Sequence, residues 1–420
     1  MIEINRQRLL ERFLRYVRVG TSADPDSQCY PSTESQRALG RLLADELVAM
    51  SAVDVRQDEH ALVYATVPST NGAGKSGAGN TPTVALVAHM DTSPEAPGDP
   101  VRPQVVENYA GGDIPLANGD RIRVDACPAL KDLVGATLIT TDGTTLLGGD
   151  DKAGVAIIME LAETLLENPH LAHGDVKVVM TCDEEIGRGT DKIDLESLDA
   201  AVAYTVDGGG AGVIDVETFS ADAATVRVIG DNIHPSIAKG RMVNAVRAAA
   251  DFVAALPRTS DSPETTEGRE GFLHPYSISG GVGEATVKLL LRSFEVSGLE
   301  HYAEVIRNAA AEVESAVPGV KFEIVIDRQY RNLRDGLSKL PESVTLAEQA
   351  FQNLGTPCVK EIIRGGTDGS ALTEKGLPTP NLSSGQHNIH SVREFACLDQ
   401  MVTATEHLVE LLSLWSNQRT

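Results

Sequence analysis

Histidines and carboxylates stand at the ends of apolar segments in this chain, and side chains of these types could bind divalent metal ions. Apolar runs over residues 83–88, 176–181 and 201–206 each lead directly into such residues. A single Asp at the end of a strand is more often a helix cap or a turn residue. Several of them together favour a shared metal site. The candidates are His89, Asp91, Asp150, Asp151, Glu184, Glu185, Asp207 and His390.

The number of candidate ligands favours two metal ions over one, because it exceeds the four ligands of a tetrahedral zinc site. The ligands of this hypothesis are His89, His390, Asp150, Glu185 and Asp207. Two neighbouring ions need a bridging carboxylate, and a water between them serves as the nucleophile of a hydrolysis. Glu184 is then free to act as a general base. Asp91, two residues after His89, can hold the other ring nitrogen of that histidine.

Alternating helices and strands predict the fold that brings these residues together. Apolar residues at helical spacing predict helices, and short continuous apolar runs predict buried strands. We expect helices at 5–18, 34–50, 154–166 and 344–353, and strands at 83–89, 176–181, 201–206 and 378–383. This alternation is typical of an α/β fold with a mostly parallel sheet flanked by helices. Ligands bind outside the carboxyl ends of such strands, where the candidate residues stand.

Residues 218–331 follow a different pattern, which predicts a second domain inserted into the first. Strands are expected at 225–229, 285–291 and 320–326, and helices at 238–256 and 299–317. Their order is that of a small α+β domain with a β-α-β-β-α-β arrangement. The predicted domains are therefore a catalytic domain over 1–217 and 332–420, and the inserted domain over 218–331.

Composition and charge exclude several classes of partner. With 60 acidic and 36 basic residues the formal charge is −24, which disfavours nucleic acid and anionic membrane surfaces. No apolar run approaches the roughly 18 residues of a membrane-spanning helix. The five scattered cysteines and the absence of a secretory signal pattern predict a cytoplasmic protein. The segment 71–76, NGAGKS, does not complete a P-loop, because Ser69 stands where that motif needs Gly.

Taken together, the segments that contain the candidate metal ligands and catalytic residues resemble the M20 family of dinuclear zinc peptidases, and within it the tripeptide aminopeptidases. The resemblance spans nearly the whole chain in the family's order, and its most specific part is TTDGTTLLGGDDKAG at 140–154. The other matching segments are HMDTS at 89–93, DEEIG at 183–187, YTVDGG at 204–209, HPSIAKG at 234–240, RGGTDG at 364–369 and the C-terminal loop with His390.

The resemblance implies two zinc ions per subunit, which cobalt or manganese could replace. The two ligand sets would be His89, Asp150 and Asp207 for one ion, and Asp150, Glu185 and His390 for the other. Glu184 would be the general base, and Asp91 would orient a ligand histidine. The peptide bond between Asp150 and Asp151 is often cis in this family. His387 lies close to His390, and the spacing before Glu394 and Phe395 favours His390 as the ligand.

The resemblance also implies the reaction, which is hydrolysis of the N-terminal peptide bond of a tripeptide. The inserted domain would act as a lid and mediate a homodimer, with His234 reaching the active site of the partner subunit. Arg292 and Arg364 are candidates for binding the C-terminal carboxylate of the peptide, because a guanidinium grips a carboxylate with two hydrogen bonds. Each of the two could instead form a structural salt bridge or anchor a loop.

Two other interpretations stay open. One is a different activity of the same family, as a dipeptidase, a carboxypeptidase or an N-acyl amino-acid hydrolase. The other is a peptide- or metal-binding relative without catalysis, which the intact Glu184 beside a complete ligand set disfavours. Preference for a free over an acylated N-terminus distinguishes the first group from a tripeptide aminopeptidase.

Overall fold

The computed structural model describes residues 2–70 and 81–418, so the segment 71–76 lies outside the described residues. The contacts divide the chain into two compact units. The first holds residues 1–216, 335–361 and 367–420, and the second holds residues 217–334 and 362–366. The sequence places the inserted domain at 218–331 and leaves the segment 362–366 outside it.

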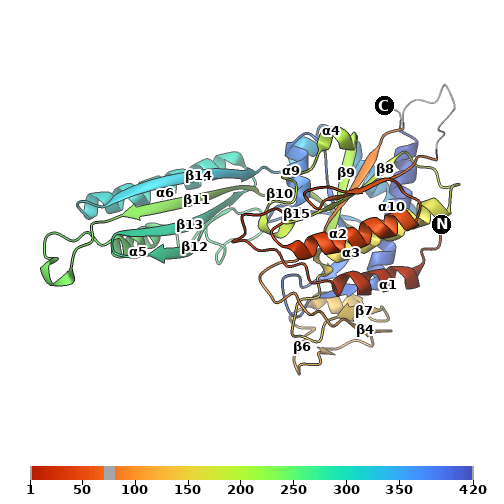
Figure 1. The fold of residues 1–420 in the computed structure, drawn as a ribbon, viewed down its shortest axis with the longest axis horizontal. Helices are drawn as coiled ribbons and strands as arrows, with labels where there is room; N and C mark the ends of the chain where they lie inside the picture. The colour runs from red at the N-terminus through yellow and green to blue at the C-terminus, as the bar shows by residue number, and fades with distance from the viewer. Residues whose placement is uncertain (1, 71–80, 419–420) are drawn as a thin grey trace. The chain divides into compact units, whose positions relative to one another are not determined.

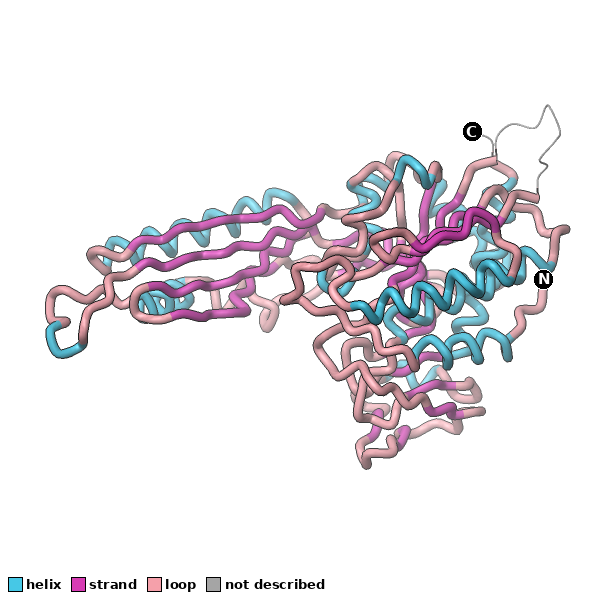
Figure 2. The backbone as a smooth tube through the Cα atoms, viewed as in Figure 1, coloured by secondary structure: helices cyan, strands magenta, loops and turns pink. Residues whose placement is uncertain are grey.

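The first unit combines helices with a large sheet (Figures 1 and 2). Its helices are α1 (Arg6–Val17), α2 (Glu34–Ala49), α3 (Gly149–Glu167), α4 (Leu195–Leu198), α7 (Arg334–Leu337), α8 (Glu342–Leu354), α9 (Asp368–Glu374) and α10 (Leu398–Ser416). The strands of the large sheet are β1 (Val53–Gln57), β2 (Val63–Val67), β3 (Val84–His89), β4 (Gln104–Val106), β7 (Leu138–Thr140), β8 (Val176–Thr181), β9 (Val202–Gly209), β10 (Val213–Thr218), β15 (Val359–Ile363), β16 (Asn381–His387) and β17 (Phe395–Cys397). A separate short hairpin joins β5 (Ile114–Pro115) and β6 (Arg121–Ile122).

The sheet has parallel strands at its centre and antiparallel strands at both edges. Its order is β1-β2-β8-β3-β9-β16-β17-β7-β4, and the neighbours β8, β3, β9 and β16 run parallel. Strands β2, β7 and β17 pair antiparallel with their neighbours. The predicted α/β class is therefore confirmed, and the carboxyl ends of β3, β8 and β9 meet at one edge of the sheet.

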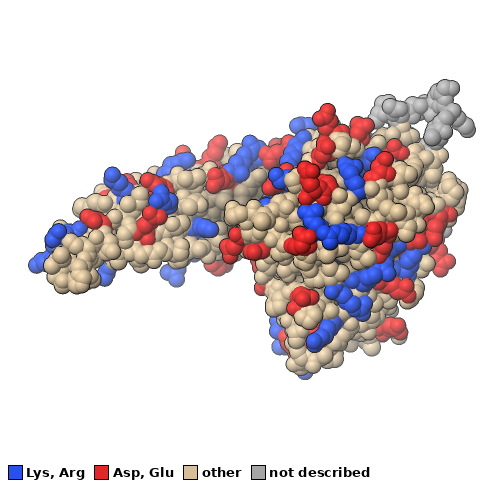
Figure 3. Space-filling view, in the orientation of Figure 1, with Lys and Arg blue, Asp and Glu red and all other residues tan. Residues whose placement is uncertain are grey.

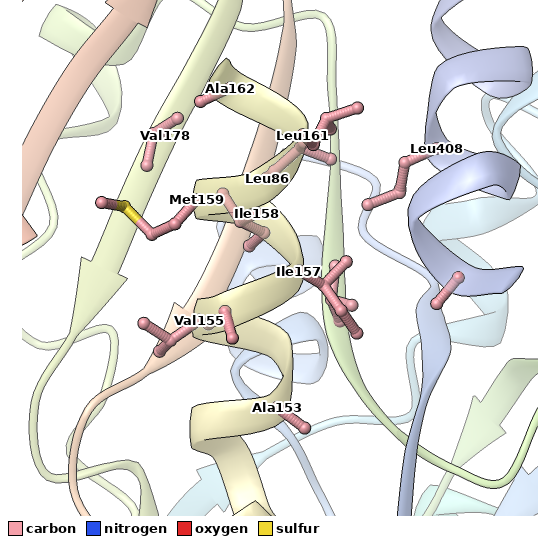
Figure 4. Packing of buried hydrophobic residues seen from close by; sticks show 14 of the residues in the cluster. Leu86, Ala153, Val155, Ile157, Ile158, Met159, Leu161, Ala162, Val178 and Leu408 are labelled. Atoms are coloured by element: carbon pink, nitrogen blue, oxygen red, sulfur yellow. The ribbon is translucent and has the colours of Figure 1, made fainter. Parts of the chain in front are cut away.

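Side chains alternate between the two faces of the sheet, and each face has its own core. From β3, Leu86 belongs to a core that includes residues of α1, α2, α3, α8 and α10, whereas Val87 belongs to a core that includes residues of α4 and α9. Helix α3 is the most buried of these helices. Figure 4 shows its side chains between Leu86 and Val178 of the sheet and Leu408 of α10. This packing fixes the first turn of α3, where the acidic pair begins, against the ends of the strands.

The second unit is the predicted β-α-β-β-α-β domain. It runs β11 (Ser220–Ile229), α5 (Ala245–Ala255), β12 (Phe272–Gly280), β13 (Glu284–Ser293), α6 (Val296–Ala316) and β14 (Lys321–Tyr330). The four strands form an antiparallel sheet in the order β12-β13-β11-β14, and one core joins it to both helices. Strand β12 was not predicted from the sequence, because this edge strand contains Pro275 and has no clear apolar alternation.

Two surface properties complete the description. Figure 3 shows acidic and basic side chains interspersed on the face it draws. Among residues 2–70 and 81–418, no helix combines the length and the apolar character needed to span a bilayer.

Candidate metal centre and active site

His89 is the last residue of β3, so the buried strand carries its ring to the edge of the sheet. The ring is 2% exposed. Its Nε2 lies 2.9 Å from Asp150 Oδ1 and 3.8 Å from Asp207 Oδ1. Its Nδ1 faces Asp91, at 3.1 Å from the backbone oxygen and 3.5 Å from Oδ1. One ring nitrogen is thus held by Asp91, and the other points toward two carboxylates.

Asp150 lies in the first turn of α3, where the backbone departs from helical geometry. Gly148 before it adopts the left-handed conformation, and the bond from Asp150 to Asp151 is cis. The two carboxylate oxygens of Asp150 face different histidines. Oδ1 faces His89 Nε2 at 2.9 Å, and Oδ2 faces His390 Nε2 at 3.4 Å. This is the arrangement expected of a carboxylate that bridges two metal ions.

Glu185 and His390 form the second half of the cluster. Glu185 lies in a short 3-10 turn (Glu184–Ile186) that follows β8, and its Oε2 is 3.0 Å from His390 Nε2. His390 stands in the loop between β16 and β17, and its Nδ1 is 3.2 Å from Glu95 Oε2. The loop after β16 therefore brings a residue about 200 positions away in sequence to the end of β8.

Asp207 lies within β9 rather than after it, since the strand extends to Gly209. Its backbone N–H donates to Asn381 Oδ1 at 3.1 Å. Gln386 Nε2 donates to Asp207 Oδ1 at 3.1 Å. Both partners come from β16, the parallel neighbour of β9. Pairing between these strands thus orients the Asp207 carboxylate toward His89.

Asp91 connects the loop after β3, to which it belongs, with the turn after β8 that contains Glu184 and Glu185. Its Oδ1 accepts the backbone N–H of Glu184 at 3.1 Å, and its Oδ2 accepts that of Glu185 at 3.0 Å. It is fully buried. From the sequence, Asp91 was predicted only to orient His89. In the structure it also accepts the backbone N–H groups of Glu184 and Glu185.

Glu394 is a buried carboxylate near the centre that the sequence analysis used only as a landmark. Its Oε2 accepts the backbone N–H groups of Leu147 at 2.7 Å and Gly148 at 2.8 Å. Its Oε1 accepts that of Asp150 at 3.0 Å. Glu394 therefore holds the turn that presents Asp150. Its position directly before the buried strand β17 was the one sequence signal, since partners nearly 250 residues away cannot be inferred from spacing.

Asp151 also lies within reach of His89 and Asp207 and could offer a ligand atom. Its two oxygens already accept backbone hydrogen bonds, from His89 N–H at 3.3 Å and from Gly154 N–H at 3.1 Å. These bonds fix the start of α3 against the end of β3. Asp150, whose oxygens face ring nitrogens, is better placed to bind metal.

The charges of the cluster shift the pKa values of its members in opposite directions. Burial raises the pKa of Glu184 and Asp207 well above the ordinary values, and neighbouring carboxylates add to this effect. Burial alone would raise the pKa of Asp150, but its hydrogen bonds to His390 and His89 lower that pKa. Burial lowers the pKa of His390, yet Asp150 and Glu185 raise it to about 11. Such an accumulation of negative charge favours binding of cations.

The donor set fits divalent metal ions. Ligand atoms of His89, Asp150 and Glu185 lie within 4.8 Å of one another, and so do those of His89, Asp151 and Asp207. Glu185 Oε1 is buried and has no hydrogen-bond partner among residues 2–70 and 81–418. A metal ion would satisfy this oxygen. Imidazole nitrogens and carboxylate oxygens together are ligands that zinc accepts.

His387 is engaged elsewhere. Its Nε2 lies 2.7 Å from Gln400 Oε1, and its ring stacks on Phe395. Burial lowers its pKa, and the contact with Gln400 opposes that shift. Of the two neighbouring histidines, the structure brings only His390 to the carboxylates.

The three candidate substrate-binding residues all belong to the second unit. His234 is exposed, and its Nδ1 lies 2.7 Å from Ser236 Oγ in a capped 3-10 turn. Arg292 donates to the backbone oxygens of Asp222 and Leu291.

Arg364 holds a loop of the second unit. Its guanidinium donates to the backbone oxygens of Gly268 at 3.0 Å and Glu270 at 2.8 Å, and to Thr266 Oγ1 at 2.8 Å. These bonds explain why the segment 362–366 belongs to this unit. They match the alternative in which Arg364 anchors a loop.

The fold and the site together define a two-domain α/β protein with a candidate binuclear metal centre. The family model of peptidase family M20/M25/M40 matches residues 140–414. The chain is 41% identical over 415 residues to a protein named peptidase T from Geobacillus thermodenitrificans, covering 98% of this chain and 99% of that one. The chain therefore belongs to peptidase family M20/M25/M40. A relative from Bacillus subtilis, 39% identical over 415 residues, is also named peptidase T.

Solved structures share the fold. A tripeptidase from Staphylococcus aureus matches with a TM-score of 0.75 and 24% identity, covering 99% of this chain and 100% of that one. A dinuclear metal binding peptidase of the M20 family from Bacillus subtilis matches with a TM-score of 0.63 and 15% identity, covering 97% and 98%.

Proposed function

We propose that this protein is a zinc-dependent aminopeptidase that hydrolyses the N-terminal peptide bond of tripeptides. The observation that carries the proposal is the placement of Asp150, whose two oxygens face His89 and His390. Relatives named peptidase T over nearly the whole chain support the substrate class. The five free cysteines agree with the prediction of a cytoplasmic enzyme.

Five residues would hold the two ions. His89, Asp150 and Asp207 would bind one, and Asp150, Glu185 and His390 the other. When bound, the ions would lower the pKa of a water molecule and polarise the scissile carbonyl group of the peptide. Asp91 keeps the Nδ1 proton of His89 in place, so that Nε2 stays available as a ligand.

Glu184 is the proposed general base. Asp91 accepts its backbone N–H and so fixes the backbone position from which its side chain extends. Burial raises the pKa of its carboxyl group, which suits a residue that must accept a proton from water and later release it. Glu184 then delivers that proton to the leaving amine of the dipeptide product.

The second unit would complete substrate binding. We propose that His234 supplies a hydrogen bond to the developing oxyanion in the partner subunit of a homodimer. Arg292 or Arg364 would bind the terminal carboxylate of the peptide, so that the distance from the metal centre selects tripeptides. Of these two, the guanidinium of Arg364 is already bound by three oxygens of its own unit.

The test measures hydrolysis of three peptides. The protein is first stripped of metal and then reconstituted with zinc. We expect release of free methionine from Met-Gly-Gly, slower cleavage of Met-Gly and no cleavage of N-acetyl-Met-Gly-Gly. Release of the C-terminal glycine would indicate a carboxypeptidase, and faster cleavage of the acetylated peptide would indicate an N-acyl hydrolase. No hydrolysis of any of them under zinc would refute the proposal.

A further inference from the structure

One N-terminal segment, residues 21–36, contacts the loop after β3, which contains Asp91, and the loop after β8, which contains Glu184 and Glu185. It runs from the loop after α1 into the first turn of α2 and contains no catalytic candidate. Its first part binds the loop after β3. Thr21 Oγ1 donates to Met90 O at 2.8 Å, Thr92 N–H donates to Thr21 O at 3.2 Å, and Ala23 N–H donates to Thr92 O at 3.0 Å. The residues that flank Asp91 are thus paired with this segment.

Its second part binds the loop after β8 through Asp183, the residue directly before Glu184. Asp183 Oδ2 accepts the backbone N–H of Ser32 at 2.8 Å, and its Oδ1 accepts Ser32 Oγ at 2.5 Å. Gln36 pairs with Asp183 twice. Its Nε2 donates to Oδ1 at 2.7 Å, and its Oε1 accepts the backbone N–H of Asp183 at 3.1 Å.

These contacts are buried and partly charged. Asp183 and Gln36 are fully buried and Ser32 is 8% exposed, so hydrogen bonds to the carboxylate are shielded from water. The guanidinium of Arg188 approaches Asp183 Oδ2 at 3.9 Å and partly balances its charge. Asp183 has a φ of 63°, a left-handed conformation that Asp tolerates better than most residues.

The same segment holds the far side of the loop. Tyr30 donates its hydroxyl to Cys182 O at 3.2 Å, and Arg188 donates to Cys29 O at 2.7 Å. The arginine also lies over the ring of Tyr30, at 5.3 Å from its centroid. The loop 182–189 is therefore fixed on both sides of Glu184 and Glu185.

We infer that Asp183, bound by Ser32 and Gln36, is a positioning residue for the proposed base Glu184 and the proposed ligand Glu185. Asp91 accepts the backbone N–H groups of those two glutamates, and Ser32 and Gln36 hold the carboxylate and the backbone N–H of Asp183, the residue before them. The backbone is therefore held by hydrogen bonds both at Asp183 and at the two glutamates. The inference rests on the proposed function for the role of Glu184, whereas the role of Glu185 as a ligand can be tested by metal binding alone.

The test replaces Gln36 by Leu, which removes both amide contacts to Asp183 without altering the loop itself. Thr405→Val is the matched control, since Thr405 is equally buried and donates to Met401 O within α10. Zinc affinity of both variants is measured by competition with a chromophoric chelator. The values of kcat and KM for Met-Gly-Gly are measured at saturating zinc.

We expect Gln36→Leu to lower the affinity for one of the two ions about 10–100-fold and to leave the other nearly unchanged, as loss of a contact behind a ligand does. The value of kcat falls about 10-fold or more, and KM stays within about threefold. If Gln36→Leu keeps wild-type metal affinities and loses only thermal stability, as Thr405→Val does, the positioning role is refuted.

A second variant provides a test if Gln36→Leu does not fold. Ser32→Ala removes one donor to Asp183 and keeps its backbone N–H, so we expect the same pattern at about threefold to tenfold. If Ser32→Ala and Gln36→Leu both fold and both leave metal binding unchanged, the inference fails. Should the protein lack tripeptidase activity, the kinetic arm fails with the proposed function, and the metal affinities still decide the role of Asp183.

Discussion

Replacing Glu394 by Gln removes one acceptor from the turn that presents Asp150, while it changes neither a ligand nor the base. The carboxylate accepts three backbone N–H groups, two at Oε2 and one at Oε1. A glutamine amide has one oxygen. If that oxygen takes the place of Oε2, the amide NH₂ faces the N–H of Asp150, and one hydrogen bond becomes a contact between two donors.

The size of the effect follows from these contacts. A hydrogen bond to a charged group contributes about 1.5–3 kcal/mol, and the two remaining bonds lose their charge assistance. We therefore expect a total loss of about 2–4 kcal/mol. A fall in metal affinity of about 10–100-fold corresponds to about 1.4–2.7 kcal/mol of this total, and the rest lowers the free energy of unfolding.

The assay is chelator competition for zinc together with urea unfolding of the metal-free protein. Asp399→Asn is the control, because Asp399 also accepts a backbone N–H, that of Thr137, and binds Arg6 away from the metal centre. The control should lower stability without changing metal affinity. If Glu394→Gln binds zinc as tightly as the wild type, or if Asp399→Asn weakens binding equally, the role assigned to Glu394 is wrong.

Three further predictions concern other parts of the chain. Burial lowers the pKa of His407 to about 4, although its hydrogen bond to the backbone oxygen of Ala347 opposes this shift. As the pH falls, the unfolded chain therefore takes up a proton at His407 before the folded chain does. The stability that the neutral His407 contributes at pH 7 is lost between about pH 6.5 and pH 4, by up to about 3 kcal/mol. Urea unfolding at pH 7 and pH 4.5 should show this loss of unfolding free energy in the wild type and not in His407→Gln. An equal loss of unfolding free energy in the two proteins would contradict the prediction. Arg292→Ala should raise KM for Met-Gly-Gly at least 10-fold, whereas Arg364→Ala should mainly lower thermal stability; the reverse result would assign the carboxylate to Arg364. A refolded one-to-one mixture of inactive His234→Ala and Glu184→Ala chains should recover about a quarter of wild-type activity, since half of the dimers are mixed and each mixed dimer has one complete site; a mixture as inactive as its parents would exclude shared sites.

Several of the candidate ligands were predictable from sequence because they stand within or close to the end of a short buried strand. The run before His89 is continuous and apolar, the run before Glu184 is apolar except for Lys177 and Thr181, and parallel strands of that kind end at one edge of a sheet. The inserted domain was equally visible, through the change from buried runs to alternating strands. Its edge strand β12 was not, because an edge strand need not bury either face fully.

The supporting contacts could not be predicted in the same way. Glu394 binds N–H groups nearly 250 residues earlier, and Asp183 binds Ser32 about 150 residues earlier. Neither pairing follows from local propensity, because each depends on how loops from separate strands meet after folding. Arg364 shows the same limit, since its bonds to the loop 266–270 become visible only once β15 is placed.

The most direct test of the account is the number of metal ions bound by two neighbouring variants. Metal-free Glu184→Ala and Glu185→Ala are titrated with zinc, and bound metal is counted by elemental analysis after exchange into metal-free buffer. We expect two ions per chain for the wild type and for Glu184→Ala, which should lack hydrolysis, and one tightly held ion for Glu185→Ala. Loss of an ion from Glu184→Ala, or full activity of a wild-type chain that holds one ion, would contradict a binuclear centre served by Glu184.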